Sequence, residues 1–215
     1  MPVPARFSEI LEREIAPWVT LTAIQVDQLH QHFELLERWN KRMNLTSIES
    51  GHERVIRHYC ESLFFGVHVP GEPISIADVG SGAGFPGIPM AVLHPNWRLA
   101  LIESNQRKGV FLREASRRLG NVRVKSSRVE ELGEKFDCLV SRAVAPGDLL
   151  ALIPRLAPRI GLMVGEEDIH LLQVAKHVAW SEPVRLPWGD RRVCMFGDYV
   201  SRETTKGSVP RGTGV

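Results

Sequence analysis

The sequence predicts an α/β protein: a doubly wound, mostly parallel sheet with an N-terminal helical extension. Beyond residue 70, short apolar runs alternate with helical segments, and such a βαβα order is typical of parallel strands covered by helices on both faces. Before residue 70, apolar residues recur only at helical spacing. We therefore expect a helical extension over 1–70, a sheet domain over 71–203 and a flexible tail over 204–215.

Two amphipathic helices account for the extension. Over 22–43 the apolar side chains step by three or four positions, and Thr22 precedes them as a candidate N-cap. A second helix is expected over 51–68, and the linker 69–73 ends it because its prolines lack the amide donor. The side chains that this second helix would bury are Val55, Tyr59, Leu63 and Phe64 or Phe65.

The sheet domain begins with five alternating strands and four helices. The apolar runs that predict strands cover 74–79, 99–103, 122–125, 137–141 and 160–164. The helical segments lie near 87–94, 105–119, 147–157 and 166–179. Beyond residue 180 the pattern weakens, and 193–200 is a candidate final strand.

Length and composition exclude several classes of protein. With 215 residues, 43% of them hydrophobic and 24% charged, the chain has the makeup of one globular domain with a modest extension. No apolar stretch approaches the ~20 residues that a bilayer span needs. Acidic residues at 9, 12 and 14 stand where a signal peptide would be apolar. We therefore expect a cytoplasmic protein that makes no membrane contact, and a monomer, since nothing indicates an obligate dimer.

Metal and disulfide chemistry are not expected. Cys60, Cys138 and Cys194 are odd in number and far apart, without a CxxC pair, so they indicate neither a disulfide framework nor a zinc site. The eight histidines show no ligand spacing.

Basic residues gather in one segment although the net charge is only +2. The stretch 104–128 carries eight lysines and arginines against the single acid Glu114. Such a patch would attract a nucleic-acid backbone and make binding sensitive to salt. A solvated helix face whose arginines cover apolar surface has the same composition, so charge alone leaves both interpretations open.

The strongest local signal is a glycine-rich loop over 76–87, Ile-Ala-Asp-Val-Gly-Ser-Gly-Ala-Gly-Phe-Pro-Gly. It follows a predicted strand and opens a predicted helix, which is the context that a ligand-binding loop of this kind requires. Glycines allow positive φ angles and close approach of a ligand to the backbone. A ligand held there would lie at the carboxyl edge of the sheet.

Two carboxylates indicate which ligand the loop would hold. Glu103 ends the second predicted strand, where it could accept hydrogen bonds from ribose hydroxyls of either S-adenosylmethionine or NAD. Asp78, two residues before Gly80, suits a cationic ligand better than a pyrophosphate, and it favours S-adenosylmethionine. The alternatives are an NAD-dependent oxidoreductase, for which no Tyr-x-x-x-Lys is present, and a non-catalytic nucleotide- or RNA-binding module.

Five motifs in one order resemble a known family. The glycine loop with its continuation, 78–89, resembles that of the glucose-inhibited division protein B (RsmG) family, the bacterial 16S rRNA guanine-N7 methyltransferases. The other matching motifs are Asn44-Leu45-Thr46 with Arg57-His58, the segment 102–108, Ser127-Arg128-Val129-Glu130-Glu131, and Ser141-Arg142-Ala143-Val144-Ala145. The resemblance covers about residues 35–165.

The resemblance implies a class I methyltransferase-like fold, S-adenosylmethionine as cofactor, and 16S rRNA or the small ribosomal subunit as partner. It also implies methylation of one guanosine and a cofactor held by Gly80, Phe85, Val129-Glu130 and Arg142. One departure is visible: family members often carry Lys-Gly after the fifth strand, where this chain has Val164-Gly165.

The chemistry of N7 methylation assigns the expected roles. Guanine N7 has a free lone pair, so no general base is needed and the reaction depends on alignment. We expect Asp78 to support the loop and the cationic end of the cofactor, Glu103 to bind ribose, and Val129-Glu130 to lie beside the adenine. Asn44 and Arg142 are the catalytic candidates, against a turn cap for Asn44 and a surface ion pair for Arg142.

The remaining candidates fall into two groups. The full cofactor set comprises Asp78, Gly80, Gly82, Gly84, Phe85, Glu103, Ser104, Val129, Glu130 and Arg142. The candidate RNA contacts are Arg57, His58, Arg107, Lys108 and Arg128. The alternative for His58 is an ordinary helix residue. The alternative for the basic side chains is plain solvated charge.

Overall fold

The centre of the computed structural model, which describes residues 4–142, 144–189 and 191–200, is an eight-stranded sheet. Five strands run parallel in the order β3-β2-β1-β4-β5, and β8 continues the sheet antiparallel to β5, with β6 and β7 paired to β8. The prediction of a doubly wound, mostly parallel sheet is confirmed. The strands are β1 (Ser75–Val79), β2 (Arg98–Ile102), β3 (Val122–Lys125), β4 (Cys138–Arg142), β5 (Arg159–Gly165), β6 (Val178–Trp180), β7 (Val184–Arg185) and β8 (Arg192–Tyr199).

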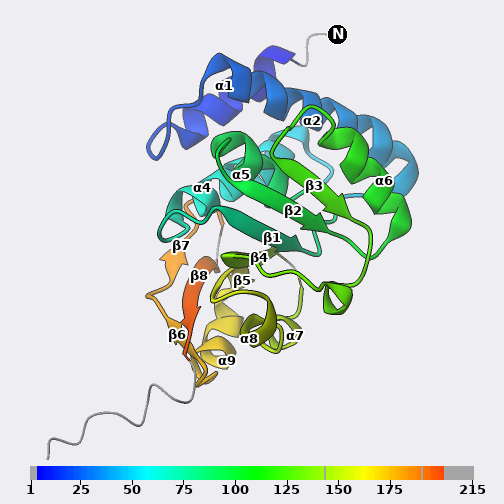
Figure 1. The fold of residues 1–215 in the computed structure, drawn as a ribbon. Coiled ribbons are helices and arrows are strands. Elements are labelled where there is room, and N and C mark those ends of the chain that lie inside the picture. The colour runs from blue at the N-terminus through cyan, green and yellow to red at the C-terminus, as the bar shows by residue number, and fades with distance from the viewer. Residues whose placement is uncertain (1–3, 143, 190, 201–215) are drawn as a thin grey trace, which may run out of the picture.

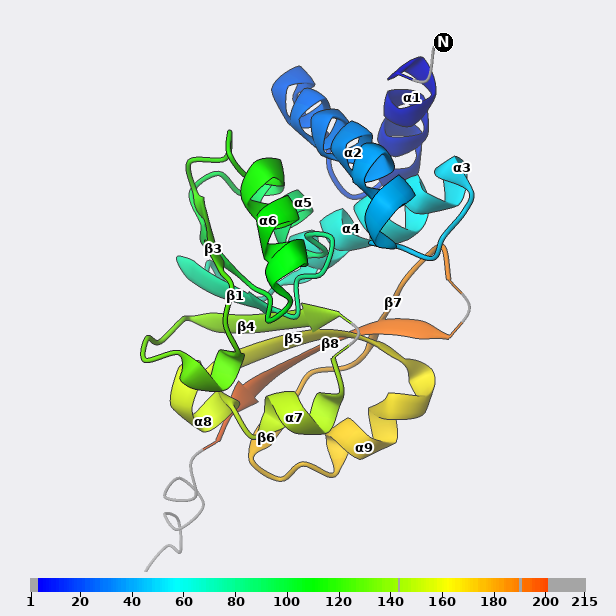
Figure 2. The same ribbon diagram turned by 90° about the vertical axis from the view of Figure 1, so that its right-hand side faces the viewer.

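Helices cover both faces of the sheet (Figures 1 and 2). In Figure 2, the helices of the first half of the chain lie above the sheet and α7, α8 and α9 lie below it. The upper helices are α1 (Pro4–Ile15), α2 (Ala23–Met43), α3 (Gly51–Arg54), α4 (Glu61–His68), α5 (Gly87–Leu93) and α6 (Gln106–Ala115). The lower helices are α7 (Pro146–Leu150), α8 (Ile153–Leu156) and α9 (Ile169–Gln173).

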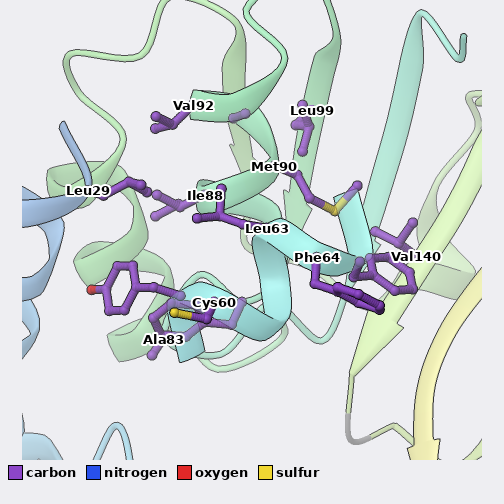
Figure 3. Close-up of a cluster of buried hydrophobic side chains, with 14 of the residues drawn as sticks. Leu29, Cys60, Leu63, Phe64, Ala83, Ile88, Met90, Val92, Leu99 and Val140 are labelled. Carbon is purple, nitrogen blue, oxygen red and sulfur yellow. The ribbon is translucent and has the colours of Figure 1, made fainter. Parts of the chain in front are cut away.

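The helical extension shares one hydrophobic core with the upper face of the sheet. Figure 3 shows Leu29 of α2 and Leu63 of α4 close to Ile88 of α5, and Leu99 of β2 and Val140 of β4 belong to the same cluster. All five side chains are buried. Because alternate residues of a strand face opposite sides, the neighbouring strand residues belong to a second core beneath the sheet. The division near residue 70 separates helices from sheet, and as a domain boundary it stays a prediction.

Helix α2 confirms the predicted helix over 22–43. Thr22 caps it through a capping box with Gln25, whose side chain also donates to the Val92 carbonyl at 3.0 Å. This contact joins the start of α2 to the end of α5. At the other end, Asn44 adopts the left-handed conformation, with φ of 44°.

The segment 51–68 is helical throughout, as predicted, but its hydrogen bonding changes within it. Between α3 and α4 lies one π-helical segment, η1 (Val55–Cys60). Val55, Tyr59 and Leu63 are buried, which confirms their predicted positions in the core. Such π segments shift the side chains that follow them and are frequent at functional sites.

Several predicted helices end earlier than expected. The segment 105–119 is helical only to Ala115, and 147–157 divides into α7 and α8. The prediction over 166–179 is wrong beyond residue 173: a 3-10 turn, η3 (Glu166–Asp168), leads into α9, and Val178–Trp180 forms β6. Helix α1 was not predicted from the sequence. The tail 204–215 lies outside the described residues, and within them no helix is long and apolar enough to cross a membrane.

Candidate active site

The glycine loop follows β1 at the carboxyl edge of the sheet, as predicted. The Gly80 and Ser81 amides both donate to the Ile102 carbonyl, which fastens the loop to the end of β2. Gly80 has a φ of +73°, and a Cβ at this position would lie 2.5 Å from Cγ2 of Val144. A side chain at position 80 would therefore be strained and would collide with the segment that follows β4.

Asp78 lies beneath the loop and has no exposed surface. Its Oδ2 accepts a hydrogen bond of 3.0 Å from the amide of Gly87, the first residue of α5. Burial raises the pKa of Asp78 to about 7, and the Gly87 hydrogen bond opposes that shift. Asp78 thus supports the loop, as one of its two predicted roles required. Contact with a cationic ligand is not available to it in this structure.

Glu103 lies at its predicted position, directly after β2 and facing the loop. Its Oε2 accepts from the Gly82 amide at 2.9 Å, and its Oε1 accepts from the Asn105 amide at 2.8 Å. An ionised carboxylate has about four acceptor positions, so two remain for hydroxyl groups of a ligand. The two backbone bonds fix the direction in which those positions point.

A cleft of about 330 Å³ opens over the ends of β1 and β2, and we call it the donor cleft. It brings together five of the predicted cofactor residues: Gly80, Glu103, Ser104, Val129 and Glu130. Its other lining residues are Val79, Ile102, Ser127, Arg128 and Val144. Arg128, a predicted RNA contact, therefore lies at the same cleft.

One arginine that sequence reasoning missed shapes the donor cleft. Val129 and Glu130 belong to the 3-10 turn η2 (Val129–Glu131). Arg155 of α8 donates to the Glu130 carbonyl at 2.8 Å and to the Val129 carbonyl at 3.3 Å. Arg155 fixes this turn from below the sheet, and a single arginine in a short helix carries no signal that could have revealed this.

Three other predicted cofactor residues do not line the donor cleft. Gly82 and Gly84 shape the loop through positive φ angles of 56° and 93°. Phe85 is buried and points toward the helical extension, where its ring stacks on His58 with 4.5 Å between centroids. The structure therefore gives the Phe85 ring a packing role, and its contact with the cofactor stays a prediction.

A second cleft, of about 240 Å³, opens over the ends of β4 and β5, and we call it the β4–β5 cleft. Val144 lines both clefts, so the two adjoin. The departure from the family pattern, Val164-Gly165, lies here. The lining residues are Glu61, Arg142, Val144, Pro146, Met163, Val164, Gly165, Asp168, Leu186 and Arg192.

Arg142 ends β4 and lines the β4–β5 cleft. Its Nη1 donates to the Arg57 carbonyl at 2.7 Å and lies 3.4 Å from Nδ1 of His58. Burial lowers the pKa of Arg142, while the charge of Glu61 raises it. The side chain is thus held by backbone inside the cleft, and the alternative of a surface ion pair is wrong.

His58 is buried, so the prediction that it contacts RNA is wrong. Its Nε2 lies 2.8 Å from the Thr46 hydroxyl, and its ring stacks on Phe85. Burial and then the charge of Arg142 lower its pKa to about 3, so the ring is neutral at physiological pH. The ordinary-helix-residue alternative is the better description, although the ring helps to position Arg142.

A buried ion pair under the β4–β5 cleft was also missed by sequence reasoning. Both oxygens of Glu61, which has no exposed surface, bond to the guanidinium of Arg192. Burial raises the pKa of Glu61, and Arg142 and Arg192 oppose that shift. Glu61 and Arg192 are 131 positions apart, and only the fold brings them together.

The remaining candidates lie on the surface. Asn44 is exposed at the end of α2, as its turn-cap alternative requires, and it lines neither cleft. Arg57 forms an ion pair with Glu53 at 2.9 Å. Arg107 and Lys108 lie in the first turn of α6, where both amides bond to the Asn105 side chain. Within the described part of the chain, no cluster of His, Cys, Asp or Glu could hold a metal ion.

Solved structures similar to this chain have the same fold. A putative O-methyltransferase from Klebsiella pneumoniae matches 92% of this chain and 99% of its own, with a TM-score of 0.61 and 15% identity. A ribosomal protein L11 methylase from Lactobacillus delbrueckii subsp. bulgaricus matches 71% of this chain and 81% of its own, with a TM-score of 0.54 and 15% identity. These matches confirm the class I methyltransferase-like fold.

Sequence relatives are more specific. The family model described as GidB, rRNA small subunit methyltransferase G, matches residues 25–164. A ribosomal RNA small subunit methyltransferase G from Stenotrophomonas maltophilia (strain K279a) is 42% identical, over 97% of this chain and 92% of its own length. One from Nitrosomonas europaea is 47% identical over 120 residues, which span 54% of this chain and 55% of that relative. The chain therefore belongs to the rRNA small subunit methyltransferase G family, and the resemblance of its motifs is confirmed.

Proposed function

We propose that this chain transfers a methyl group from S-adenosylmethionine to N7 of a guanosine in 16S rRNA. Membership of the family confirms the expected enzyme class and methyl donor, and it sets aside the NAD-dependent alternative. The observation that carries the proposal is the pair of adjoining clefts at the carboxyl edge of the sheet. The donor cleft is lined by the glycine loop and the Glu103 carboxylate, and the β4–β5 cleft is lined by Arg142.

The donor cleft fits S-adenosylmethionine in size and chemistry. Its volume lies at the lower end of the range usual for small-molecule sites. Glu103 offers two free acceptor positions to the ribose hydroxyls, and η2 offers backbone and the Val129 side chain to the adenine. Gly80 lines the cleft with its backbone, where the methionine end would lie. When bound, S-adenosylmethionine supplies an electrophilic methyl group on a sulfonium.

The residues of the chain contribute alignment rather than proton transfer. N7 of neutral guanine carries no proton, so the side chains need not remove one. Orientation of two reactants can account for roughly 7–11 kcal/mol of a barrier. Val144, shared by both clefts, lies where the two reactants would meet. Arg142, fixed by the Arg57 carbonyl, would hold the nucleotide or the methionine carboxylate beside it.

Contacts to the RNA backbone would come from basic side chains at and around the donor cleft, of which Arg128 lines it. Arg107 and Arg128 are exposed, and Lys108 is partly exposed. Arg57 adds a fourth charge on the side of the extension. We assign these side chains to phosphate contacts, and Asn44, which is exposed two residues before Thr46, to the same RNA-facing surface. The small ribosomal subunit or its RNA as substrate, a monomeric state and action in the cytoplasm belong to the same proposal.

The test is to map methylated purines by mass spectrometry in small-subunit rRNA from cells with and without this protein. A 7-methylguanosine that depends on the protein is expected. The rate of methyl transfer by Arg142→Ala should fall about 100-fold or more, since the cleft would lose the guanidinium that the Arg57 carbonyl holds at the end of β4. Arg98→Ala, an exposed arginine at the opposite edge of the sheet, is the control. Full activity of Arg142→Ala would show that its proposed role is wrong.

A further inference from the structure

We propose that the β4–β5 cleft binds the Watson–Crick edge of the guanine to be methylated, and that Asp168 selects guanine over adenine. The inference rests on the proposed function and deepens it. Enzymes that modify a base commonly take it out of its stack and read that edge in a pocket. The β4–β5 cleft adjoins the donor cleft through Val144, so a base in it would have its reactive edge near the donor.

Asp168 is the carboxylate in this cleft that is free to act as a reader. It stands at the N-cap position of α9 but makes no side-chain capping bond. Across residues 4–142, 144–189 and 191–200, no hydrogen bond or ion pair of its carboxylate is present. It is partly exposed and lines the cleft. Glu61, the other carboxylate, is fully buried and has both oxygens bonded to Arg192.

The donors and acceptors of the cleft match guanine. Its Watson–Crick edge presents O6 as an acceptor, then N1–H and the N2 amino group as donors. An ionised carboxylate only accepts and a guanidinium only donates, so Asp168 suits N1–H and N2, and Arg142 or Arg192 suits O6. Adenine in the same orientation would direct its N6 amino group at a guanidinium and its N1 lone pair at a carboxylate. Both contacts would be repulsive.

The charges of the β4–β5 cleft also favour guanine as its ligand. Methylation at N7 gives the base a positive charge. The two arginines of the cleft are balanced by Glu61 and Asp168, so the formal charges sum to zero. Without Asp168, the developing cation would face a net positive surrounding, and electrostatic terms of this kind weigh heavily inside a site that excludes water. A phosphate in this cleft would instead be repelled by Asp168.

The experiment compares Asp168→Asn, which keeps the shape but loses the charge, with Asp148→Asn, an exposed carboxylate of α7 that lines neither cleft. Substrates are reconstituted small subunits that carry guanosine or inosine, which lacks N2, at the methylated position. On guanosine, kcat/KM of Asp168→Asn should fall about 10- to 100-fold, as expected for a lost bidentate base contact. The Kd for S-adenosylmethionine should not change.

Inosine separates base reading from a structural effect. The kcat/KM of the wild type should be about 10-fold lower on inosine than on guanosine. For Asp168→Asn the difference should be much smaller, because its contact to N2 is already gone. Equal losses in both proteins would overturn the proposal. Higher activity of Asp168→Asn would also overturn it and would indicate a phosphate site.

A binding measurement keeps this inference separate from the proposed function. If the wild type transfers no methyl group to small-subunit RNA, the proposed function fails. Saturation-transfer NMR with free guanosine and adenosine then still tests the cleft. Preference of the wild type for guanosine, lost in Asp168→Asn and retained in Asp148→Asn, would support the proposal. No preference in the wild type would refute it.

Discussion

Asp78 makes the stability of this fold depend on pH. Burial raises its pKa from 3.8 to about 7. Because the folded-state pKa lies above the unfolded one, the unfolded chain binds fewer protons between these values. The free energy of unfolding therefore falls as the pH rises from about 4 to about 7, by at most about 1.4 kcal/mol per pH unit from this one group.

Replacing Asp78 by asparagine should remove that dependence. Urea unfolding at pH 5 and pH 8 would show the wild type losing stability relative to Asp78→Asn between the two values. Asp137→Asn is an informative comparison, because hydrogen bonds from Ser75 hold the pKa of Asp137 below its usual value. The contribution of Asp137 to the free energy of unfolding is lost only as the pH falls below about 4. Parallel stability curves of the wild type and Asp78→Asn would contradict the prediction.

Glu103 should control affinity for the methyl donor. Its carboxylate fixes two amides and retains two acceptor positions toward the donor cleft. Hydrogen bonds to charged groups contribute about 1.5–3 kcal/mol each. In Glu103→Ala, which loses two such bonds, the Kd for S-adenosylmethionine measured by calorimetry should rise about 100-fold or more. Glu131→Ala, an exposed acid just outside the cleft, should bind normally. Equal affinities of Glu103→Ala and the wild type for S-adenosylmethionine would mean that Glu103 only shapes the loop.

Asp78 and Glu103 show how much of a binding site can be predicted from residue types and positions alone. Both were expected to face the ligand, from their positions at the ends of strands. The structure places Glu103 at the cleft and Asp78 beneath the loop. Asp78 was the reason for preferring S-adenosylmethionine over NAD, so the preferred ligand was right and that reason was wrong. The direction of a side chain at a strand end depends on the loop that follows.

The ion pair between Glu61 and Arg192 joins two elements that are far apart in the sequence. Glu61 begins α4, and Arg192 begins β8 opposite Gly165 of β5. Removing one partner of a buried pair leaves an uncompensated charge, which typically costs 3–5 kcal/mol. The pair therefore fixes the packing of α4 against the antiparallel part of the sheet.

Arg192→Met should accordingly destabilise the fold by about 3 kcal/mol or more in urea unfolding. The double variant Glu61→Leu/Arg192→Met should recover most of that loss, because neither member of the pair is left without its partner. A double variant less stable than Arg192→Met would contradict this account. A matched exposed pair is Arg57 and Glu53, for which Arg57→Met should cost less than about 1 kcal/mol.

At the element scale, strand predictions held better than helix ends. The five parallel strands lie within one residue or two of their expected bounds, because a strand buried on both faces needs a continuous apolar run. The helix expected over 166–179 failed because Val178 pairs with Tyr199 of β8. No local pattern reveals that partner. The capped start of α2 was predictable because the cap is local.

For the whole molecule, the distribution of charge predicts salt-sensitive RNA binding. Arg107 and Lys108 lie at the start of α6, on the face of the sheet covered by the extension. If both contact phosphate, the variant Arg107→Ala/Lys108→Ala should bind RNA more weakly. Its slope of log K against log salt concentration should be smaller by about 1.5. Filter binding at several salt concentrations measures both.

The control removes the same charge elsewhere. Lys135 and Lys176 are exposed and line neither cleft, so Lys135→Ala/Lys176→Ala should leave the salt slope nearly unchanged. Equal slopes for the two double variants would show that the basic segment acts through general charge. In that case its arginines would be the solvated helix face that composition alone also allows.

The sequence by itself determined the fold class, the glycine loop, the position of Glu103 and the family, because each depends on local order along the chain. Only the tertiary structure decided that Asp78, His58 and Phe85 are buried. It alone also brought Glu61, Asp168 and Arg192 around Arg142 in one cleft. The physical reason is that periodicity and turn chemistry act over a few residues. Burial and charge pairing instead depend on contacts between residues far apart in the sequence, such as Glu61 and Arg192, which are 131 positions apart.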